Sequence, residues 1–240
     1  MPRRTVRVDV VDHVAGASGA RGIAVVVDVF RAFSVAPHAM AAGASRVVPV
    51  GEVAEALALR QVMPDALLVG ERHARRLPGF DAGNSPTEVL ALDLAGRTVV
   101  HTTHAGTQGL VNATAADEVL TGSFVNASAI ARYVQRRRPD LVTIVRMGHE
   151  ARERCAEDDL CAAALMTLLH GGSAPDTAYV RDRLRDAPAA QKFFDPACDW
   201  APEPDFGYCT EVDRFDFVLR LCRGSDGTPE LERIAVPGSP

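Results

Sequence analysis

The sequence predicts an α/β fold in which helices cover both faces of a largely parallel sheet. Short apolar runs stop abruptly at polar or glycine residues, as the run 25–27 does before Asp28. Most of these runs are followed by stretches whose apolar residues have helical spacing, such as Ala54, Leu57 and Ala58. Strand-like and helix-like segments that alternate in this way indicate βαβ units, which build a parallel sheet between layers of helices.

The individual elements follow from the same two patterns. Runs rich in β-branched residues and bounded by glycine, aspartate or proline indicate strands at about 5–11, 22–28, 46–50, 66–70, 97–101, 117–121 and 141–147. Helical spacing of apolar residues, as at Val125, Ile130 and Val134, is typical of an amphipathic helix. It indicates helices at 31–42, 52–62, 85–93, 106–113, 124–138 and 157–169, and a helical stretch at 174–194.

We expect a single domain over residues 1–240, because a chain of this length supports one substantial core. The composition changes after about residue 195, where prolines and glycines interrupt the chain. In this segment, residues 215–219 and 231–236 are expected to pair as a terminal hairpin or to form edge strands. The tail at 237–240 is expected to fray.

Composition and charge argue against several classes of protein. A formal net charge of −5 gives no basic footprint for nucleic acid, and no apolar stretch approaches the roughly 20 residues of a membrane span. The basic start, residues 1–4, is not followed by an apolar segment of signal-peptide type, so we expect a cytoplasmic protein. The five cysteines contain no C-x-x-C pair, which argues against a disulfide framework and a zinc knuckle. The sequence does not indicate the size of any oligomer, and a homodimer is one alternative.

The polar residues that end the strands mark the candidate site. In an open parallel sheet, ligands bind beyond the carboxyl ends of the strands. Asp28 and Glu71 lie at two such ends, and Arg31 opens the helix that follows the first. Together they offer metal-ligating carboxylates and a guanidinium suited to a phosphate group. The plainer alternative is a helix cap with a surface ion pair.

A second group of candidates lies where helices are expected to begin. Ser85, before a proline and three residues ahead of a glutamate, has the pattern of a helix cap, and Asn84 stands beside it. Backbone amides at a helix start can bind an anion. Hydroxyl, amide and glycine residues recur at later strand ends, at Thr103, Gly106, Thr107, Ser123 and Asn126. Each of these alone is more often an ordinary cap, but several at one edge of a sheet indicate a phosphate-binding site.

The acidic triplet 157–159 opens a further helix. Acids in a first turn stabilise a helix by about 0.3–1 kcal/mol through its dipole, which is a sufficient structural reason for them. The triplet is nevertheless denser than a cap requires. With Asp28 and Glu71, the carboxylates of Glu157 and Asp158 could form an oxygen-rich site for Mg²⁺.

Several known phosphate chemistries are excluded by missing motifs. The chain has no G-x-x-x-x-G-K-[ST] sequence, and no cysteine is followed by an arginine six positions later. Residue 30 is Phe, where a haloacid-dehalogenase-type enzyme would carry a second aspartate after Asp28. The run 72–75 lacks the glycine of the R-H-G motif of histidine phosphatases.

Taken together, these clusters resemble the ComB family of Mg²⁺-dependent 2-phosphosulfolactate phosphatases. The resemblance covers roughly residues 5–170 and rests on V-D-V-F-R-A at 27–32, G-E-R at 70–72, G-F-D-A-G-N-S-P at 79–86, T-T at 102–103 with G-T at 106–107, G-S-F-V-N-A at 122–127 and E-D-D-L-C-A at 157–162. It implies a three-layer α/β/α fold and Mg²⁺ as cofactor. It also implies hydrolysis of 2-phospho-3-sulfolactate to 3-sulfolactate and phosphate, a step toward coenzyme M.

Two loops depart from the family pattern. His104 and Ala105 stand where a single asparagine is usual, and residues 73–76 replace a glycine-rich link. The second change places Arg75 and Arg76 beside the expected pocket, where they would favour a small phosphomonoester with a second anionic group, which can differ from the family's own substrate. The plainer alternative is a solvated loop that does not contact the substrate. Two other functions stay open: a non-catalytic anion-binding regulatory protein, and a lyase or isomerase of a phosphorylated acid.

Overall fold

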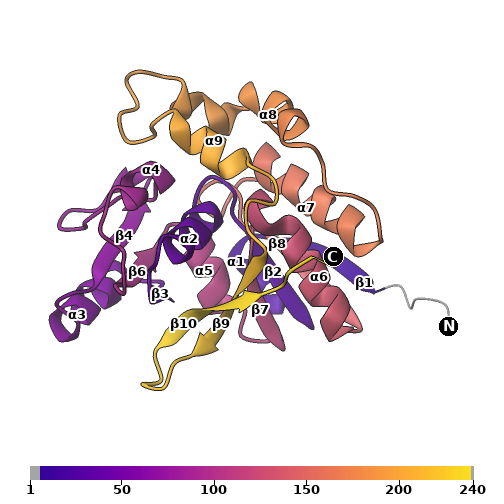
Figure 1. Cartoon of the computed structure of the whole chain (residues 1–240), viewed down its shortest axis with the longest axis horizontal. Coiled ribbons are helices and arrows are strands. Elements are labelled where there is room, and N and C mark those ends of the chain that lie inside the picture. Colours follow the sequence, from indigo (N-terminus) through magenta and orange to yellow (C-terminus); the bar gives the residue numbers. More distant parts are fainter. Residues whose placement is uncertain (1–5, 239–240) are drawn as a thin grey trace.

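The computed structural model describes residues 6–238 and is drawn in Figure 1. Its described strands form one ten-stranded mixed sheet in the order β1-β8-β2-β7-β9-β10-β3-β6-β4-β5. Helices cover both faces of the sheet. The expected α/β fold, with three layers and a largely parallel sheet, is therefore confirmed.

The sheet consists of two parallel halves. The first half is made of β1 (Arg7–Asp12), β8 (Leu141–Arg146), β2 (Ile23–Val27) and β7 (Glu118–Gly122). The second half is made of β3 (Arg46–Pro49), β6 (Thr98–Thr102) and β4 (Leu67–Arg72), with the short antiparallel β5 (Arg75–Arg76) at its edge. Residue 5, where the first strand was expected to start, lies outside the described residues.

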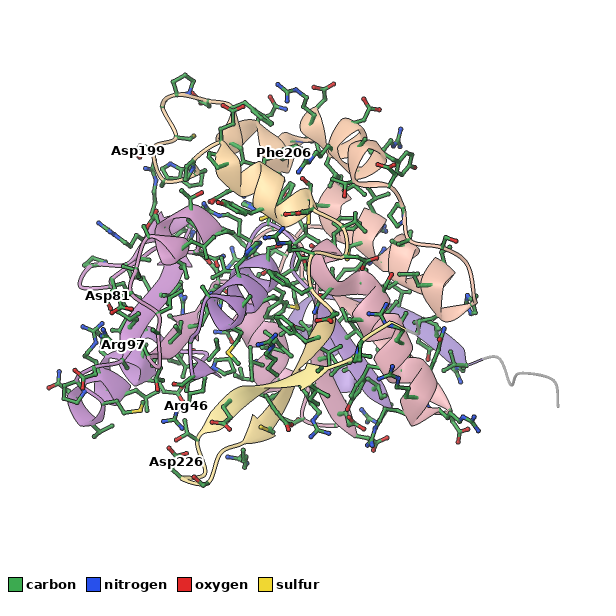
Figure 2. The ribbon with its side chains drawn as sticks, in the orientation of Figure 1. Arg46, Asp81, Arg97, Asp199, Phe206 and Asp226 are labelled. Atoms are coloured by element: carbon green, nitrogen blue, oxygen red, sulfur yellow. The ribbon has the colours of Figure 1, made fainter. Side chains whose placement is uncertain are left out.

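The carboxyl-terminal hairpin joins the two halves. It is made of β9 (Phe217–Arg223) and β10 (Pro229–Ala235), and β9 pairs with β7 while β10 pairs with β3, both antiparallel. Beyond the backbone pairing, Arg46 of β3 forms an ion pair with Asp226 in the hairpin turn at 3.0 Å, and Figure 2 labels both residues. The expected terminal hairpin is confirmed, whereas the alternative of edge strands is wrong.

Alternate residues of the central strands bury their side chains on opposite faces, as the pleat of a strand requires. Val25 and Val27 pack under α6 (Ala127–Arg137), α7 (Ala156–Leu169) and α8 (Thr177–Arg185). Ala24 and Val26 pack under α1 (His13–Gly19), α2 (Ala32–Ala41) and α5 (Gly106–Asn112). In the second half, Val48 and its neighbours pack against α3 (Val53–Val62). Such strands are apolar throughout, which is why the sequence shows them clearly.

Several helices differ from their expected form. α1 was not expected, because its sequence is rich in alanine and glycine and has little apolar periodicity. The helical stretch at 174–194 is divided, because Pro188 starts a separate 3₁₀ helix, η2 (Pro188–Phe193). α9 (Pro204–Thr210) was also not expected, and it lies beside α4 (Pro86–Leu90) at the upper edge of Figure 1. The helix expected at 124–138 starts as a 3₁₀ turn, η1 (Phe124–Asn126), before α6.

The fold brings two separate parts of the chain to the carboxyl ends of the parallel strands. Residues that follow β2, β4, β6 and β8 lie there, and η2 and the loop around Trp200 face them. Within residues 6–238, no helix is long and apolar enough to cross a membrane. The predicted end of the tail, Ser239 and Pro240, lies outside the described residues, as do residues 1–4 of the basic start.

Candidate active site

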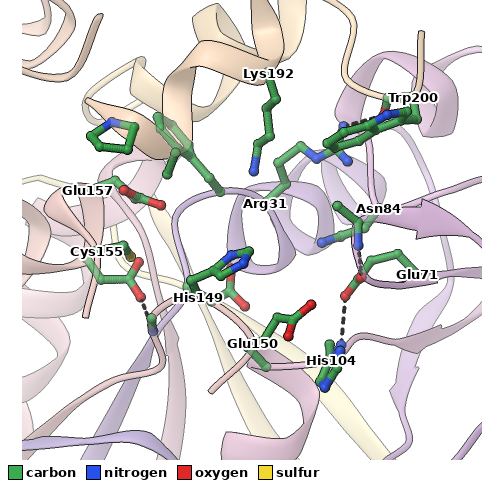
Figure 3. A pocket seen from close by; sticks show the side chains of 18 residues that line it. Arg31, Glu71, Asn84, His104, His149, Glu150, Cys155, Glu157, Lys192 and Trp200 are labelled. Atoms are coloured by element: carbon green, nitrogen blue, oxygen red, sulfur yellow. Dashed lines mark hydrogen bonds between the residues drawn. The ribbon is translucent and has the colours of Figure 1, made fainter. Parts of the chain in front are cut away.

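A cavity of about 200 Å³ lies at the carboxyl ends of the parallel strands. Figure 3 shows its side chains converging from the strand ends below and from η2 and the Trp200 loop above. Its charged and polar lining is contributed by Asp28, Arg31, Glu71, Asn84, His104, His149, Glu150, Glu157, Asp158 and Lys192. The pocket thus lies where the parallel sheet predicts a ligand site.

Asp28 follows β2 directly and is almost fully buried. Its Oδ1 accepts a hydrogen bond from the backbone N–H of Ala32 at 3.2 Å, so the residue does cap the start of α2. Burial raises the pKa of Asp28 to about 7, and the negative charge of Glu71 adds to the increase. Gly106 is needed at this point, because a Cβ there would lie 2.7 Å from Asp28 Oδ2. One carboxylate oxygen therefore caps a helix, and the other approaches the start of α5.

Glu71 is held in place by two backbone amides. Its Oε1 accepts from the N–H of His104 and its Oε2 from the N–H of Ala74, both at 2.7 Å. These amides belong to the loops after β6 and β4, so the carboxylate links two neighbouring strand ends. Each oxygen keeps a further lone pair for a ligand.

Glu157 and Asp158 enter the same pocket from the first turn of α7. Asp158 accepts hydrogen bonds from the backbone N–H of Val29 at 2.9 Å and of Gly148 at 2.8 Å. Burial raises the pKa of Asp158 well above its usual range, with the charge of Asp28 adding to the effect. Burial also raises the pKa of Glu157, whose Oε2 has no hydrogen-bond partner among the described residues. These carboxylates are costly to keep ionised without a cation nearby.

Arg31 brings a buried positive charge into the pocket. Its Nη1 forms an ion pair with Asp205 Oδ2 at 2.7 Å and donates to the carbonyl oxygen of Trp200 at 3.0 Å. Asp205 is fully buried, and its second oxygen accepts from Ser85 Oγ at 3.0 Å and from the N–H of Thr87 at 2.9 Å. The carboxyl-terminal part of the chain therefore fixes the position of the guanidinium.

Asn84 is positioned by a buried histidine. His101 Nε2 lies 3.1 Å from Asn84 Oδ1. Burial lowers the pKa of His101 to about 4, so the ring is neutral near pH 7 and can donate through Nε2–H to that oxygen. The other half of the Asn84 amide is a donor group at the pocket lining.

The remaining predicted site residues lie outside the pocket lining. Ser85 caps α4 by accepting from the N–H of Glu88, as its sequence pattern indicates. Thr103 and Thr107 hydrogen bond to one another across the start of α5. Ser123 contacts the hydroxyl of Ser34 at 2.8 Å, and Asn126 donates to the carbonyl of Phe217. Arg75 and Arg76 are exposed on β5, and Arg75 lies over the Trp200 ring at 4.9 Å.

Sequence reasoning missed several polar residues at or behind the pocket. They include His104, His149, Glu150, Lys192, Trp200 and Asp205. Burial and the neighbouring Arg31 lower the pKa of Lys192. Trp200 Nε1 is buried and has no hydrogen-bond partner within residues 6–238. None of these residues carries a local sequence pattern that indicates a site.

The donor set of the pocket fits a divalent cation. Five carboxylates line it, from Asp28, Glu71, Glu150, Glu157 and Asp158, against two basic side chains, Arg31 and Lys192. The buried Oε2 of Glu157, which has no hydrogen-bond partner among the described residues, also indicates a ligand site. A second cluster, of His73, His104 and Glu150, has ligand atoms that all lie within 4.8 Å of one another.

The fold and this pocket define an α/β enzyme that combines carboxylates with anion-binding groups at one strand edge. Residues 9–224 match the family model described as 2-phosphosulpholactate phosphatase, and the chain belongs to this family. The match extends well beyond the region around 5–170 that carried the resemblance.

Individual relatives agree with the family match. The chain is 29% identical to the probable 2-phosphosulfolactate phosphatase of Bacillus subtilis, over 89% of this chain and 92% of the relative. It is 34% identical to a protein of the same description from Caldanaerobacter subterraneus, over 83% and 88% of the two chains. A third such protein, from Thermotoga petrophila, is 34% identical over 84% and 89%. These similarities place the chain among enzymes of a phosphatase family.

Proposed function

We propose that this chain is a Mg²⁺-dependent phosphomonoester hydrolase that converts 2-phospho-3-sulfolactate and water to 3-sulfolactate and phosphate. The observation that carries the proposal is the surplus of carboxylates over cations in one small pocket. A phosphate ester is an anion, so it binds beside these groups only with a cation between them. The description shared by the relatives supports the choice of substrate.

The carboxylates of Asp28, Glu71, Glu157 and Asp158 are the proposed Mg²⁺ ligands. Oxygen donors of this kind are the ones that Mg²⁺ prefers. When bound, the ion polarises the phosphoryl group and offsets the charge that develops on it. The backbone hydrogen bonds of Glu71 and Asp158 keep these side chains in place before any ligand binds, so little reorganisation is needed.

Arg31, Lys192 and Asn84 are the proposed phosphate-binding groups. Arg31 is held by Asp205, and its remaining N–H groups suit the oxygens of a phosphoryl group. Lys192 adds a point charge beside Arg31 at the upper side of the pocket in Figure 3. We assign an indirect role to the other predicted residues, which hold the backbone that surrounds the anion: Ser85, Thr103, Gly106, Thr107, Ser123 and Asn126.

Arg75 and Arg76 are the proposed selectivity residues. The exposed guanidinium of Arg75 stacks on Trp200, which lines the pocket, and forms a 3.6 Å ion pair with Asp199. A substrate with a second anionic group, such as a sulfonate, would carry that group toward this side. We infer a contribution to substrate choice rather than to the chemical step.

Release of inorganic phosphate is the measurement that tests the proposal. The protein is incubated with 2-phospho-3-sulfolactate and with simple phosphomonoesters, each with Mg²⁺ and with excess EDTA. We expect phosphate release that requires the divalent cation and is fastest with the sulfonated substrate. Equal rates in EDTA would contradict the metal dependence. Substrate binding without phosphate release would favour the anion-binding protein, and a product that retains its phosphate would favour a lyase or isomerase.

We also propose a cytoplasmic location. Among residues 6–238 all five cysteines are free thiols, which is the usual condition in a reducing compartment. A homodimer is the oligomer that we propose to test, by sedimentation of the intact chain over a range of concentrations.

A further inference from the structure

Three residues at the rim of the pocket come together from three separate loops. His73 follows β4, His104 follows β6, and Glu150 follows β8. One ligand atom from each lies within 4.8 Å of the other two. Figure 3 shows His104 and Glu150 at the lower side of the pocket, next to Glu71. We propose that His73, His104 and Glu150 form a second cation site, for a divalent transition-metal ion of the zinc type.

The chemistry of the donors separates this site from the carboxylate group deeper in the pocket. Two imidazoles and one carboxylate are a set that binds zinc, with three protein ligands and one position left for water or a substrate oxygen. Mg²⁺ instead prefers oxygen ligands throughout and binds imidazole poorly. The pocket thus offers two sites of different selectivity, one of oxygen donors and one of mixed nitrogen and oxygen donors.

The present contacts of the cluster leave ligand atoms for an ion. His104 Nδ1 is buried and has no hydrogen-bond partner in the described part of the chain. His73 Nδ1 and Glu150 Oε1 lie 2.6 Å apart, and the rings of His73 and His104 meet edge to face with centroids 4.9 Å apart. A metal ion would replace this direct contact between His73 and Glu150 and bridge the two ligand atoms.

The reach of the side chains is compatible with coordination. With bonds of about 2.0 Å, the ligand atoms of a tetrahedral zinc ion lie about 3.3 Å apart. The ligand atoms of His73 and Glu150, now 2.6 Å apart, must therefore separate slightly, while any pair near the 4.8 Å limit must approach. His73 can move in this way because 72% of its side chain is exposed. His104 is less free, since its backbone N–H donates to Glu71. The site would thus be built on His104 and Glu150, and the exposed ring of His73 would move to complete it.

Two of the proposed ligands share an unusual backbone conformation with a positive φ angle. His73 and Glu150 have φ values of 51° and 50°, and the following residues Ala74 and Ala151 have 61° and 55°. Side chains other than glycine seldom adopt this left-handed region, and such residues concentrate at functional sites. Here both residues lie beside His104.

Binding of Co²⁺ tests the site without reference to phosphatase activity. Tag-free, metal-free protein is titrated with Co²⁺, whose visible absorption is strong at sites of low coordination number with nitrogen ligands and weak at six-coordinate oxygen sites. We expect one Co²⁺ per chain with the stronger absorption, displaced by an equal amount of Zn²⁺ and retained in excess Mg²⁺. The absence of a saturable strong absorption would overturn the proposal.

Variants assign the absorption to its ligands. We expect His73→Asn and His104→Asn each to weaken Co²⁺ binding at least about tenfold, while His170→Asn, an exposed control, binds as the wild type does. Because His73 is exposed, we expect that variant to fold as the wild type does, and circular dichroism checks this. Asp28→Asn removes a ligand of the proposed Mg²⁺ site and should keep the strong absorption. Wild-type affinity in both histidine variants, or loss of the absorption in Asp28→Asn, would refute the site independently of the Mg²⁺ proposal.

Discussion

The amino-terminal region, residues 6–170, and the carboxyl-terminal segment, residues 188–238, contribute to the pocket in different ways. The amino-terminal region supplies every carboxylate that lines it, each at or near the end of a strand or the start of a helix. The carboxyl-terminal segment supplies Lys192, Trp200 and the partner of Arg31, from a 3₁₀ helix, a loop and a short helix. The first region therefore presents the chemical groups, and the second encloses and orients them.

The same division holds for the sheet. Both parallel halves come from the amino-terminal region, yet they do not pair with one another, because β9 and β10 lie between them. A segment that resembles a terminal addition in the sequence is thus central to the structure. This comparison leads to predictions about stability and activity, and to one about substrate choice.

The largest effect is expected from removal of the hairpin. A chain that ends at Arg214 lacks β9 and β10, so the two halves of the sheet lose their connection and the core loses buried side chains such as Leu219 and Leu231. We expect loss of cooperative thermal unfolding, measured by circular dichroism, as a single domain over 1–240 requires. A control that ends at Val236 keeps both strands and should unfold as the full chain does. A cooperative transition near the original temperature in the shorter chain would show that the halves form a stable sheet without the hairpin.

Asp28→Asn tests the region that presents the chemistry. The substitution keeps the volume and can preserve the contact with Ala32 N–H, but it removes the negative charge proposed to bind Mg²⁺. We expect kcat to fall at least about 100-fold with the fold intact, as is typical when a metal ligand or base is lost. Asp159→Asn is the matched control, because Asp159 pairs with Arg146 and Arg154 outside the pocket. If Asp28 were only a cap, the variant would lose about 1 kcal/mol of stability and keep its rate.

Asp205→Asn tests the contact between the two regions. The variant leaves the buried charge of Arg31 without its ion-pair partner, which costs about 3–5 kcal/mol of unfolding free energy at such sites. We expect a loss of this size by urea denaturation, together with a higher KM because the guanidinium is no longer fixed. Ser85→Ala removes a neutral donor to the same carboxylate and the cap of α4, each worth about 1 kcal/mol, so it should cost less, about 2 kcal/mol.

Arg31→Lys extends the same test. A compact ammonium group does not reproduce the planar fork of arginine, so we expect it not to rescue Arg31→Ala. Near-normal kcat and KM in the lysine variant would show that only the charge matters at this position.

The sequence predicts the first region well because its signals are local. A buried parallel strand is a continuous apolar run, and the residue that ends it is visible beside it, as with Asp28 and Glu71. The contacts of the second region depend on tertiary structure. Asp205 lies 174 positions from Arg31, and nothing in the proline-rich sequence around it indicates a buried ion pair. The central position of the hairpin in the sheet could not be predicted for the same reason, since its strands pair with β3 and β7, which are distant in the sequence.

His101 and Asn84 form a neutral buried pair, which can be compared with the buried ion pair of Arg31 and Asp205. The pKa of His101 is lowered from 6.5 to about 4 by burial, so between these pH values the unfolded chain binds a proton that the folded chain does not. Stability from this group is therefore full above pH 6.5 and is lost as the pH falls toward 4, by about 3 kcal/mol in all. We expect His101→Gln to show a smaller loss of unfolding free energy than the wild type between pH 6.5 and 4. An unchanged pH dependence, equal to that of the exposed control His170→Gln, would show that His101 titrates normally in the folded chain.

The smallest effect is expected at Arg75 and Arg76, where β5 meets the Trp200 loop. Both side chains are exposed, and exposed charge pairs contribute about 0.2–1 kcal/mol, which corresponds to a change of about 1.4-fold to 5-fold in kcat/KM. We expect Arg75→Ala to lower the ratio of kcat/KM for phosphomonoesters with a second anionic group over simple ones by this factor. The decrease should be smaller for Arg76→Ala, since Arg75 is the residue that contacts Trp200 and through it the pocket. The ratio should also become less sensitive to salt in Arg75→Ala, because the lost interaction is one between exposed charges. An unchanged ratio in the double variant would assign substrate choice to the enclosed groups, Arg31 and Lys192, and would leave the β5 loop without a part in selectivity.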